Sequence, residues 1–224
     1  MSDKSLLLGV ETAYPTSYSP GVLSAISRSQ GRELLGLTDK QPFFGFDLWT
    51  AYELSWLDLK GKPVVAVADI SMPCDTDNLV ESKSLKLYLN SLNQEQYSSA
   101  QDVSVVLERD IAACVKGTVL VDIHTPDSYR NLGLGSFSGV CLDDMDIDLV
   151  VDTYEPDPSL LSLDDGGMAV TESFYSHLFK TNCPVTGQPD WASLLIRYTG
   201  WPIVPEGLLK YIISYRNHQG FHEQ

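Results

Sequence analysis

Apolar side chains gather in two short runs, residues 50–57 and 63–72, which the polar segment DLKGK separates. Both runs are rich in β-branched and aromatic residues, and the segment between them places a glycine at the turn. Two such runs around a short glycine-bearing turn are typical of an antiparallel β-hairpin. We therefore expect the organised part of the chain to begin with this hairpin.

Two later stretches repeat their apolar residues at helical spacing. In the first, which Glu81 opens, the apolar positions are Leu85, Tyr88, Leu89 and Leu92. In the second, over residues 100–116, they are Val103, Val106, Leu107, Ile111 and Cys114. Recurrence every three or four residues predicts one buried face for each helix. With further strands expected over 118–124 and 136–142, the order predicts an α+β fold with an antiparallel sheet.

The rest of the chain falls into parts of different composition. Residues 1–45 are rich in Ser, Pro, Gly and Tyr, which predicts an N-terminal extension with little regular structure. Residues 46–142 form a first module, and the acidic stretch 143–170 predicts a linker. In residues 171–224, Thr171 is the expected N-cap of a helix through Lys180, followed by a loop, a strand and a helix that starts at Pro205.

The charge of the chain excludes some classes of partner. Asp and Glu number 30 against 15 Lys and Arg, so the formal net charge is -15. Such a field repels phosphate backbones and anionic membranes, and we expect no direct nucleic-acid partner. The N-terminus does not resemble a signal peptide, and no stretch is long enough to span a membrane, so we expect a cytoplasmic protein.

Neither the cysteines nor the acidic stretch predicts a metal site. The four cysteines, at positions 74, 114, 141 and 183, show no metal-ligand spacing and are expected to be reduced thiols. Asp144, Asp146, Asp148 and Glu155 do fall at ligand positions of a calcium loop. Leu149, however, stands where the sharp turn needs glycine, and residues 149–151 resemble a strand. A solvated acidic linker is therefore the prediction.

Cys183 is the best candidate for a chemical centre, because it lies in the Pro- and Gly-bounded loop TNCPVTGQPDW. A cysteine acts as a nucleophile in its thiolate form. A buried packing role fits Cys114, on an apolar helix face, better than it fits a loop position. Asp190, seven positions on, is a candidate proton donor or acceptor beside the sulfur, with an Asx-turn or a strand end as the alternative.

Cations and acids near two other points also suggest binding. The first turns of the first helix carry Ser82, Lys83 and Lys86. Free N–H groups at a helix N-terminus favour an anion, whereas a lysine there opposes the helix dipole. The pattern indicates either a phosphate site or a solvated face with incidental lysines. Near the end of the sequence, His222 and Glu223 offer a proton donor and a carboxylate, with a polar chain end as the alternative.

Three motifs taken together resemble one family. They are ESKSLKLY at residues 81–88, the cysteine loop with Asp190, and the FHE triplet at residues 221–223. The combination resembles the QueF family, the NADPH-dependent 7-cyano-7-deazaguanine reductases of queuosine biosynthesis, in its two-module form. The similarity runs from about Pro42 to the last residue. It implies a tandem tunnelling fold, with two helices on one face of each antiparallel sheet, and assembly as a homodimer or a larger barrel-based oligomer.

The resemblance also implies an enzyme that reduces a nitrile to a primary amine with two molecules of NADPH. Cys183 would attack the nitrile carbon while Asp190 protonates the nitrogen, which gives a covalent thioimide, and His222 would help to deliver protons. The residues implied to bind the purine-like base are Glu81, Phe221, His222 and Glu223. Those implied to meet the NADPH phosphates are Ser82, Lys83 and Lys86.

Members of this two-module form continue past the FHE triplet, so the resemblance predicts an incomplete second module. The alternative to a nitrile reductase is a non-catalytic or impaired tunnelling-fold protein that binds a purine-like base, with the thiol as a spectator. A thiol amidohydrolase that uses His222 as its base is a third hypothesis.

Overall fold

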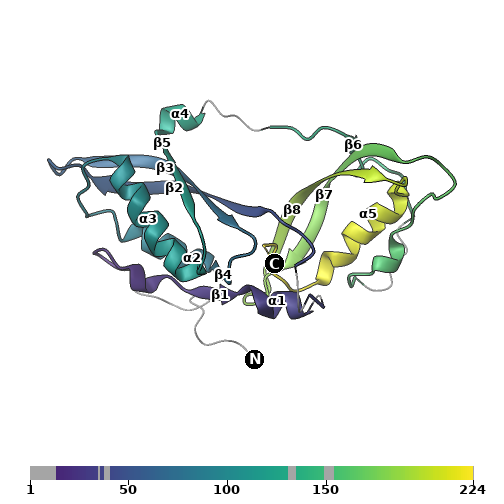
Figure 1. Ribbon diagram of the computed structural model, residues 1–224, viewed down its shortest axis with the longest axis horizontal. Helices are drawn as coiled ribbons and strands as arrows, with labels where there is room; N and C mark the ends of the chain where they lie inside the picture. Colours follow the sequence, from purple (N-terminus) through teal and green to yellow (C-terminus); the bar gives the residue numbers. More distant parts are fainter. Residues whose placement is uncertain (1–13, 35, 38–40, 131–134, 149–153, 224) are drawn as a thin grey trace. The chain divides into compact units, whose positions relative to one another are not determined.

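A computed structural model describes residues 14–34, 36–37, 41–130, 135–148 and 154–223 (Figure 1). The chain divides into two compact units, residues 1–133 with 223–224, and residues 134–222. Each unit has its own sheet and its own apolar core. Across the described ranges, no helix combines the length and the hydropathy that a membrane span requires.

The main sheet of the first unit has the strand order β2-β3-β5, and both pairings are antiparallel. Its strands are β2 (Phe46–Leu57), β3 (Pro63–Pro73) and β5 (Leu120–His124). Figure 1 shows that α2 (Ser82–Asn90) and α3 (Ala100–Val115) lie on the same side of this sheet. The predicted hairpin and both predicted helices are therefore confirmed. A short helix, α4 (Pro126–Arg130), follows β5.

The apolar stripes of both helices form the core of this unit. Fully buried apolar residues are Tyr88 in α2, Leu92 just after it, and Val103, Leu107, Ile111 and Val115 in α3. They pack with Leu54, Ala68, Ile70 and Met72 of the sheet. Each such side chain contributes about 1.5–3 kcal/mol by leaving water. This core fixes α2, and with it the residues of the ESKSLKLY motif.

The N-terminal region is more regular than its composition predicts. Its described part contains a 3₁₀-helix, η1 (Pro20–Val22), a strand, β1 (Ala25–Ser27), and a helix, α1 (Arg28–Leu34). Strand β1 pairs antiparallel with β4 (Asn78–Val80). The prediction of little regular structure over residues 1–45 is thus wrong for this part, because the hydrogen-bonding partner of β1 lies about 50 residues away and leaves no local signal.

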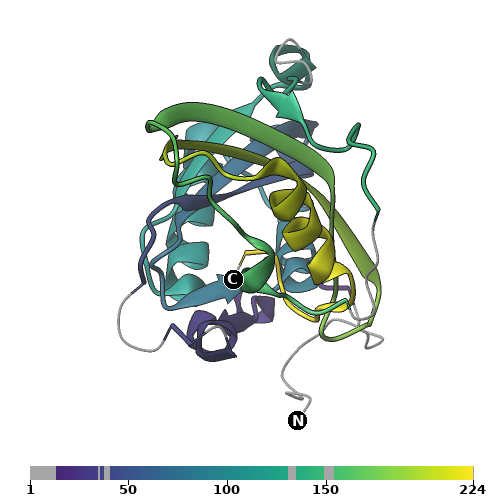
Figure 2. The same ribbon diagram turned by 90° about the vertical axis from the view of Figure 1, so that its right-hand side faces the viewer.

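The sheet of the second unit has the order β6-β7-β8. Its strands are β6 (Val140–Cys141), β7 (Val170–Asn182) and β8 (Pro189–Gly200), and β7 pairs antiparallel with β8 and parallel with β6. Helix α5 (Pro205–Ser214) packs against the hairpin (Figure 2), and the 3₁₀-helices η2 (Pro158–Leu160) and η3 (Tyr215–Asn217) complete the unit. The strand and the helix predicted after the cysteine loop are confirmed.

The predicted helix from Thr171 to Lys180 is wrong, because this segment is part of strand β7. Phe174 and Ser176 are buried in the alternation of a strand, but the pairing with β8 then shifts between Ser176 and Phe179. A bulge of this kind changes the phase of the alternation. Apolar residues three and four positions apart therefore arise in a strand and imitate a helical pattern.

The strand predicted over residues 136–142 is also wrong in length and in partner. Only Val140 and Cys141 are in a strand, and they pair with β7 of the second unit. Leu142 is fully buried in the core of that unit, and its burial stabilises the segment at that position. The strand-like residues 149–151 lie outside the described residues, and the proposed domain limits stay predictions.

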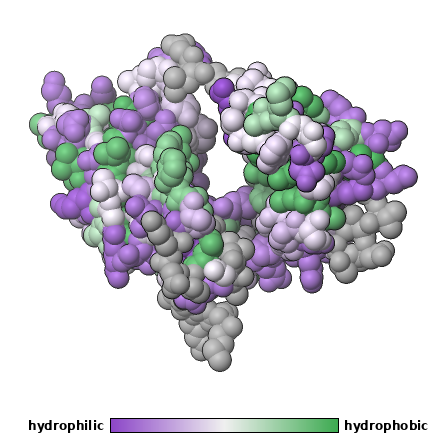
Figure 3. Space-filling view, turned by 45° about the vertical axis from the view of Figure 1, so that its right-hand side comes forward, coloured by the Kyte–Doolittle hydropathy of each residue, from purple (hydrophilic) through white to green (hydrophobic). Residues whose placement is uncertain are grey.

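Apolar surface remains exposed on both units, as the green areas between the purple polar atoms in Figure 3 show. Large exposed side chains on the two sheets include Phe46, Leu48, Tyr52 and Leu120 in the first unit and Trp191 and Leu195 in the second. Apolar patches on a folded chain often mark surfaces that another chain or a ligand covers.

Candidate functional site

Cys183 directly follows β7, at the tight end of the β7–β8 hairpin. Its backbone N–H donates to the carbonyl of Gln188 at 2.8 Å, and its carbonyl accepts from the N–H of Gly187 at 2.9 Å. Gly187 has a φ of 70°, a left-handed conformation that glycine adopts without strain. The closed loop leaves Cys183 only 7% exposed. The expectation that burial is less natural at this loop position is therefore wrong.

Asp190 lies near the start of β8, directly opposite Thr181 of β7. Opposite residues of an antiparallel pair share a face of the sheet, as do residues two apart on one strand. The register therefore places Asp190 and Cys183 at the same end of the hairpin. Asp190 is exposed, and within the described residues its carboxylate has neither a hydrogen bond nor an ion pair. Its side chain is open to a ligand.

The segment that leads into the FHE triplet is bound to the residue before the cysteine. The N–H of Asn182 donates to the carbonyl of His218 at 2.8 Å, and the N–H of Gly220 donates to the carbonyl of Asn182 at 3.2 Å. The imidazole of His222 is exposed, and its ring centre lies 5.2 Å from that of Phe179 in β7. The chain entering the triplet is therefore anchored beside Cys183, although the two motifs are 38 residues apart.

In the first unit, Glu81 caps the helix that it precedes. Its side chain is almost fully buried, and its two carboxylate oxygens accept the N–H groups of Lys83 at 3.1 Å and of Ser84 at 2.7 Å. A carboxylate at this place satisfies unpaired donors and interacts well with the helix dipole. The N–H groups that the sequence suggested for an external anion are therefore occupied by Glu81 itself.

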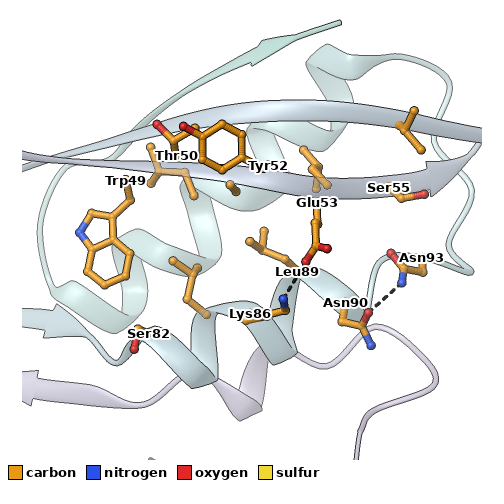
Figure 4. Close-up of a pocket in the computed structure, with 15 residues that line it drawn as sticks. Trp49, Thr50, Tyr52, Glu53, Ser55, Ser82, Lys86, Leu89, Asn90 and Asn93 are labelled. Atoms are coloured by element: carbon orange, nitrogen blue, oxygen red, sulfur yellow. Dashed lines mark hydrogen bonds and ion pairs between the residues drawn. The ribbon is translucent and has the colours of Figure 1, made fainter. Parts of the chain in front are cut away.

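Ser82 and Lys86 line a cavity of about 800 Å³ between β2 and α2 (Figure 4). The ammonium of Lys86 lies 2.7 Å from a carboxylate oxygen of Glu53, and both side chains are largely exposed. The hydrogen bond between them, and then their opposite charges, lower the pKa of Glu53 and raise the pKa of Lys86. Lys83 does not line this cavity; it is half-buried at the helix start.

Sequence reasoning missed the other residues of this cavity. Trp49, Tyr52, Glu53, Asn90 and Asn93 are among them, and Figure 4 shows them around the space between the strand and the helix. One signal was available, since Ser82, Lys86 and Asn90 recur at intervals of four residues on one helix face. The residues that β2 contributes to the cavity show no comparable spacing in the sequence.

Glu223 belongs by contacts to the first unit, whereas Phe221 and His222 belong to the second. The backbone carbonyl of Glu223 accepts a hydrogen bond from the guanidinium of Arg28 at 3.2 Å. Phe221 and Glu223 are both half-buried. Arg28 is a residue that sequence reasoning did not single out.

The fold and the candidate residues define an α+β protein with one buried thiol at a hairpin end and carboxylates suited to bind a small polar ligand. Residues 14–123 match the family described as nitrile reductase, 7-cyano-7-deazaguanine-reductase N-term. The chain belongs to the family of the NADPH-dependent 7-cyano-7-deazaguanine reductases, as the expected resemblance implied.

Curated relatives of that name cover nearly all of the chain. The protein of Burkholderia multivorans is 49% identical over 217 residues, which are 97% of this chain and 78% of the relative. That of Cupriavidus necator is 50% identical over 219 residues, again 97% and 78%. That of Bordetella pertussis is 49% identical over 223 residues, 100% of this chain and 81% of the relative.

Proposed function

We propose that this chain catalyses the NADPH-dependent reduction of the nitrile of 7-cyano-7-deazaguanine to a primary amine, a step of queuosine biosynthesis. The observation that carries the proposal is the identity of 49–50% across 97% of the chain with reductases of that name. The position of Cys183 and Asp190 at one end of the β7–β8 hairpin supports it.

The chemistry begins with addition of the Cys183 thiol across the carbon–nitrogen triple bond. A carbon–sulfur bond forms while the S–H bond breaks, and Asp190 passes the thiol proton to the nitrogen, which gives a neutral thioimide. When bound, NADPH supplies a hydride to this carbon and, in a second round, another to the imine carbon. Between the rounds the carbon–sulfur bond breaks and Cys183 leaves. Asp190 and His222 deliver the protons that accompany the two hydrides.

The purine-like base is held by carboxylates and an aromatic ring. Each carboxylate oxygen has more than one acceptor site, so Glu81 retains capacity for the N–H groups of a base while it caps α2. Glu223 would accept further N–H groups, and Phe221 would pack against the base. His222 lies next to both of these residues in sequence and also contacts the substrate.

The cavity between β2 and α2 has a size that small-molecule sites commonly have. Ser82 and Lys86 on its wall, with Lys83 at the helix start, would hold the phosphates of NADPH. Glu53 competes for Lys86, because their ion pair must open before Lys86 binds a phosphate. Since this pair is exposed, its opening costs little.

The tandem tunnelling fold, the homodimer and the four-part division of the chain belong to the same proposal. Exposed apolar side chains on both sheets support assembly with a second copy. The cytoplasmic location stays a prediction.

The deciding experiment measures NADPH oxidation with and without 7-cyano-7-deazaguanine, together with the intact mass of the protein. We expect nitrile-dependent oxidation and a mass increase equal to the nitrile, both absent in Cys183→Ala and both kept in Cys114→Ala, which removes a thiol on α3. Base binding by calorimetry that is unchanged in Cys183→Ser, without adduct or turnover, would instead identify a non-catalytic binding protein.

A further inference from the structure

Arg28 is one of the most deeply buried charged residues of the chain, with 1% of its surface exposed. Three nitrogens of its guanidinium bind three separate segments. Nε donates to the hydroxyl of Thr76 at 3.1 Å, Nη2 forms an ion pair with Asp47, and Nη1 donates to the backbone carbonyl of Glu223 at 3.2 Å. Such a buried cation requires this set of partners, because an unpaired charge in the interior is very costly.

The partners of Arg28 differ in how firmly they are held. The backbone N–H of Arg28 donates to the carbonyl of Asp77, and the hydroxyl of Thr76 donates to the carbonyl of Asn78. The backbone of Arg28 and the side chain of Thr76 are therefore held at the turn before β4. Glu223, by contrast, lies in a turn outside the helices and strands. Arg28 is therefore the firmly held partner, and its hydrogen bond restrains the backbone of Glu223.

The same short segment also holds the other proposed base-binding carboxylate. Four residues before Arg28, the carbonyl of Ser24 accepts the N–H of Glu81 at 2.8 Å, and the N–H of Ser24 donates to the hydroxyl of Ser84 at 3.0 Å. Residues 24–28 thus contact the backbones of both Glu81 and Glu223. Within the described residues, the Glu223 carboxylate has neither a hydrogen bond nor an ion pair and is available to a ligand.

We propose that Arg28 is a positioning residue, which holds the backbone of Glu223 so that its carboxylate meets the N–H groups of the purine-like base. The inference rests on the proposed function, since it assigns Arg28 to the same base-binding site. Arg28 does not itself touch the base. Replacing Arg28 should therefore weaken base binding only because Glu223 is no longer held in place.

The test is a double-mutant cycle in the full chain, in a Cys183→Ala background that prevents adduct formation. Calorimetry gives the Kd of 7-cyano-7-deazaguanine for the parent, Arg28→Lys, Glu223→Gln and the double variant. A lysine offers a single nitrogen, which cannot occupy the separate positions of Nε, Nη1 and Nη2 at once. We expect Arg28→Lys to raise the Kd about tenfold, the value of one hydrogen bond from a charged group, and to have no further effect when Glu223→Gln is present.

A purely structural role would lower the fraction of binding-competent protein and leave the Kd of that fraction unchanged. That result, or full additivity with Glu223→Gln, overturns the inference. If Arg28→Lys does not fold, Thr76→Val carries the test, because it removes the acceptor of Nε, together with the bond from the same hydroxyl to the carbonyl of Asn78, and keeps the guanidinium of Arg28. A smaller rise in Kd, again absent with Glu223→Gln, is expected. A parent that binds no nitrile overturns the proposed function and this inference together.

Discussion

The backbone N–H of Gly220 donates a hydrogen bond of 3.2 Å to the carbonyl of Asn182, the residue that directly precedes Cys183. The N–H of Asn182 in turn binds the carbonyl of His218, so the two segments pair as a short parallel bridge. Through this bridge, the chain that leads into Phe221 and His222 is held against the last residue of β7, directly before the thiol.

Gly220→Pro should separate the two segments, because proline has no N–H to donate. We expect the rate of adduct formation at Cys183 to fall about tenfold to a hundredfold, as small displacements in a reactive site do. Gly220→Ala is the matched control, since it keeps the N–H. Its Cβ would meet the imidazole of His218, with Nε2 at 2.9 Å and Cδ2 at 3.2 Å, at the end of a side chain that can rotate away. Equal losses in both variants would contradict a role for the bridge.

Glu81→Gln should affect both stability and base binding. In the parent, both carboxylate oxygens of Glu81 accept backbone N–H groups, and the amide nitrogen of glutamine would replace one of these acceptors with a donor. We therefore expect a loss of about 1–2 kcal/mol in the free energy of unfolding, measured with urea. Ser99→Ala removes the cap of α3, whose hydroxyl accepts the N–H of Asp102, and should cost about 1 kcal/mol. Only Glu81→Gln should also weaken binding of the base; equal Kd values for both variants would argue against the proposed role of Glu81.

Lys86→Met should raise the KM for NADPH and leave the KM for the nitrile unchanged, because Lys86 is proposed to bind a phosphate. Glu53→Gln should have the opposite effect on NADPH, since it releases Lys86 from its ion pair. Lys210→Met breaks a similar pair with Glu206 on α5 and serves as the control. Steady-state kinetics of the three variants measure these KM values. A KM for NADPH that is the same in all three would exclude Lys86 from the cofactor site.

The buried carboxylate of Asp110 should make stability depend on acidic pH. Burial raises its pKa, but hydrogen bonds from Arg109, Tyr18 and Tyr88 outweigh burial and leave the pKa below its usual value. Burial and the bond to Asp110 also raise the pKa of Tyr18 to about 12, so this hydroxyl remains a donor. The stability from a lowered carboxyl pKa is complete above the unfolded value, about 3.9, and is lost as the pH falls through the folded value.

Asp110→Asn should therefore lower the free energy of unfolding by about 2–3 kcal/mol at neutral pH and reduce its fall in acid. Urea unfolding between about pH 3 and 7 measures both effects over the range where carboxylates titrate. Asp75→Asn, at an exposed carboxylate, is the control and should keep the parent profile. An unchanged acid dependence in Asp110→Asn would show that this carboxylate is not the titrating group.

The elements that sequence analysis predicted correctly are those whose signals are local. The β2–β3 hairpin follows from two apolar runs and a glycine turn, and α2 and α3 follow from apolar stripes at helical spacing. The motifs around Glu81, Cys183 and His222 likewise indicated the family before any fold was known, because each motif is a contiguous stretch.

The predictions that were wrong concern elements whose hydrogen-bonding partners are distant in the chain. Strand β7 has a helix-like pattern because of its bulge, and only pairing with β8 makes it a strand. The three-residue strand β1 has no pattern long enough to detect, and it forms because β4 supplies its hydrogen bonds.

The sequence by itself determined the family, the α+β class and the candidate residues, since these follow from motifs and from local periodicity. Only the tertiary structure decided that Cys183 is buried, that Glu81 occupies the N–H groups of its own helix, and that Arg28 binds Glu223 across 195 positions of sequence. The physical reason is that periodicity records which face of an element is buried, whereas side-chain and backbone partners are chosen only when distant segments meet.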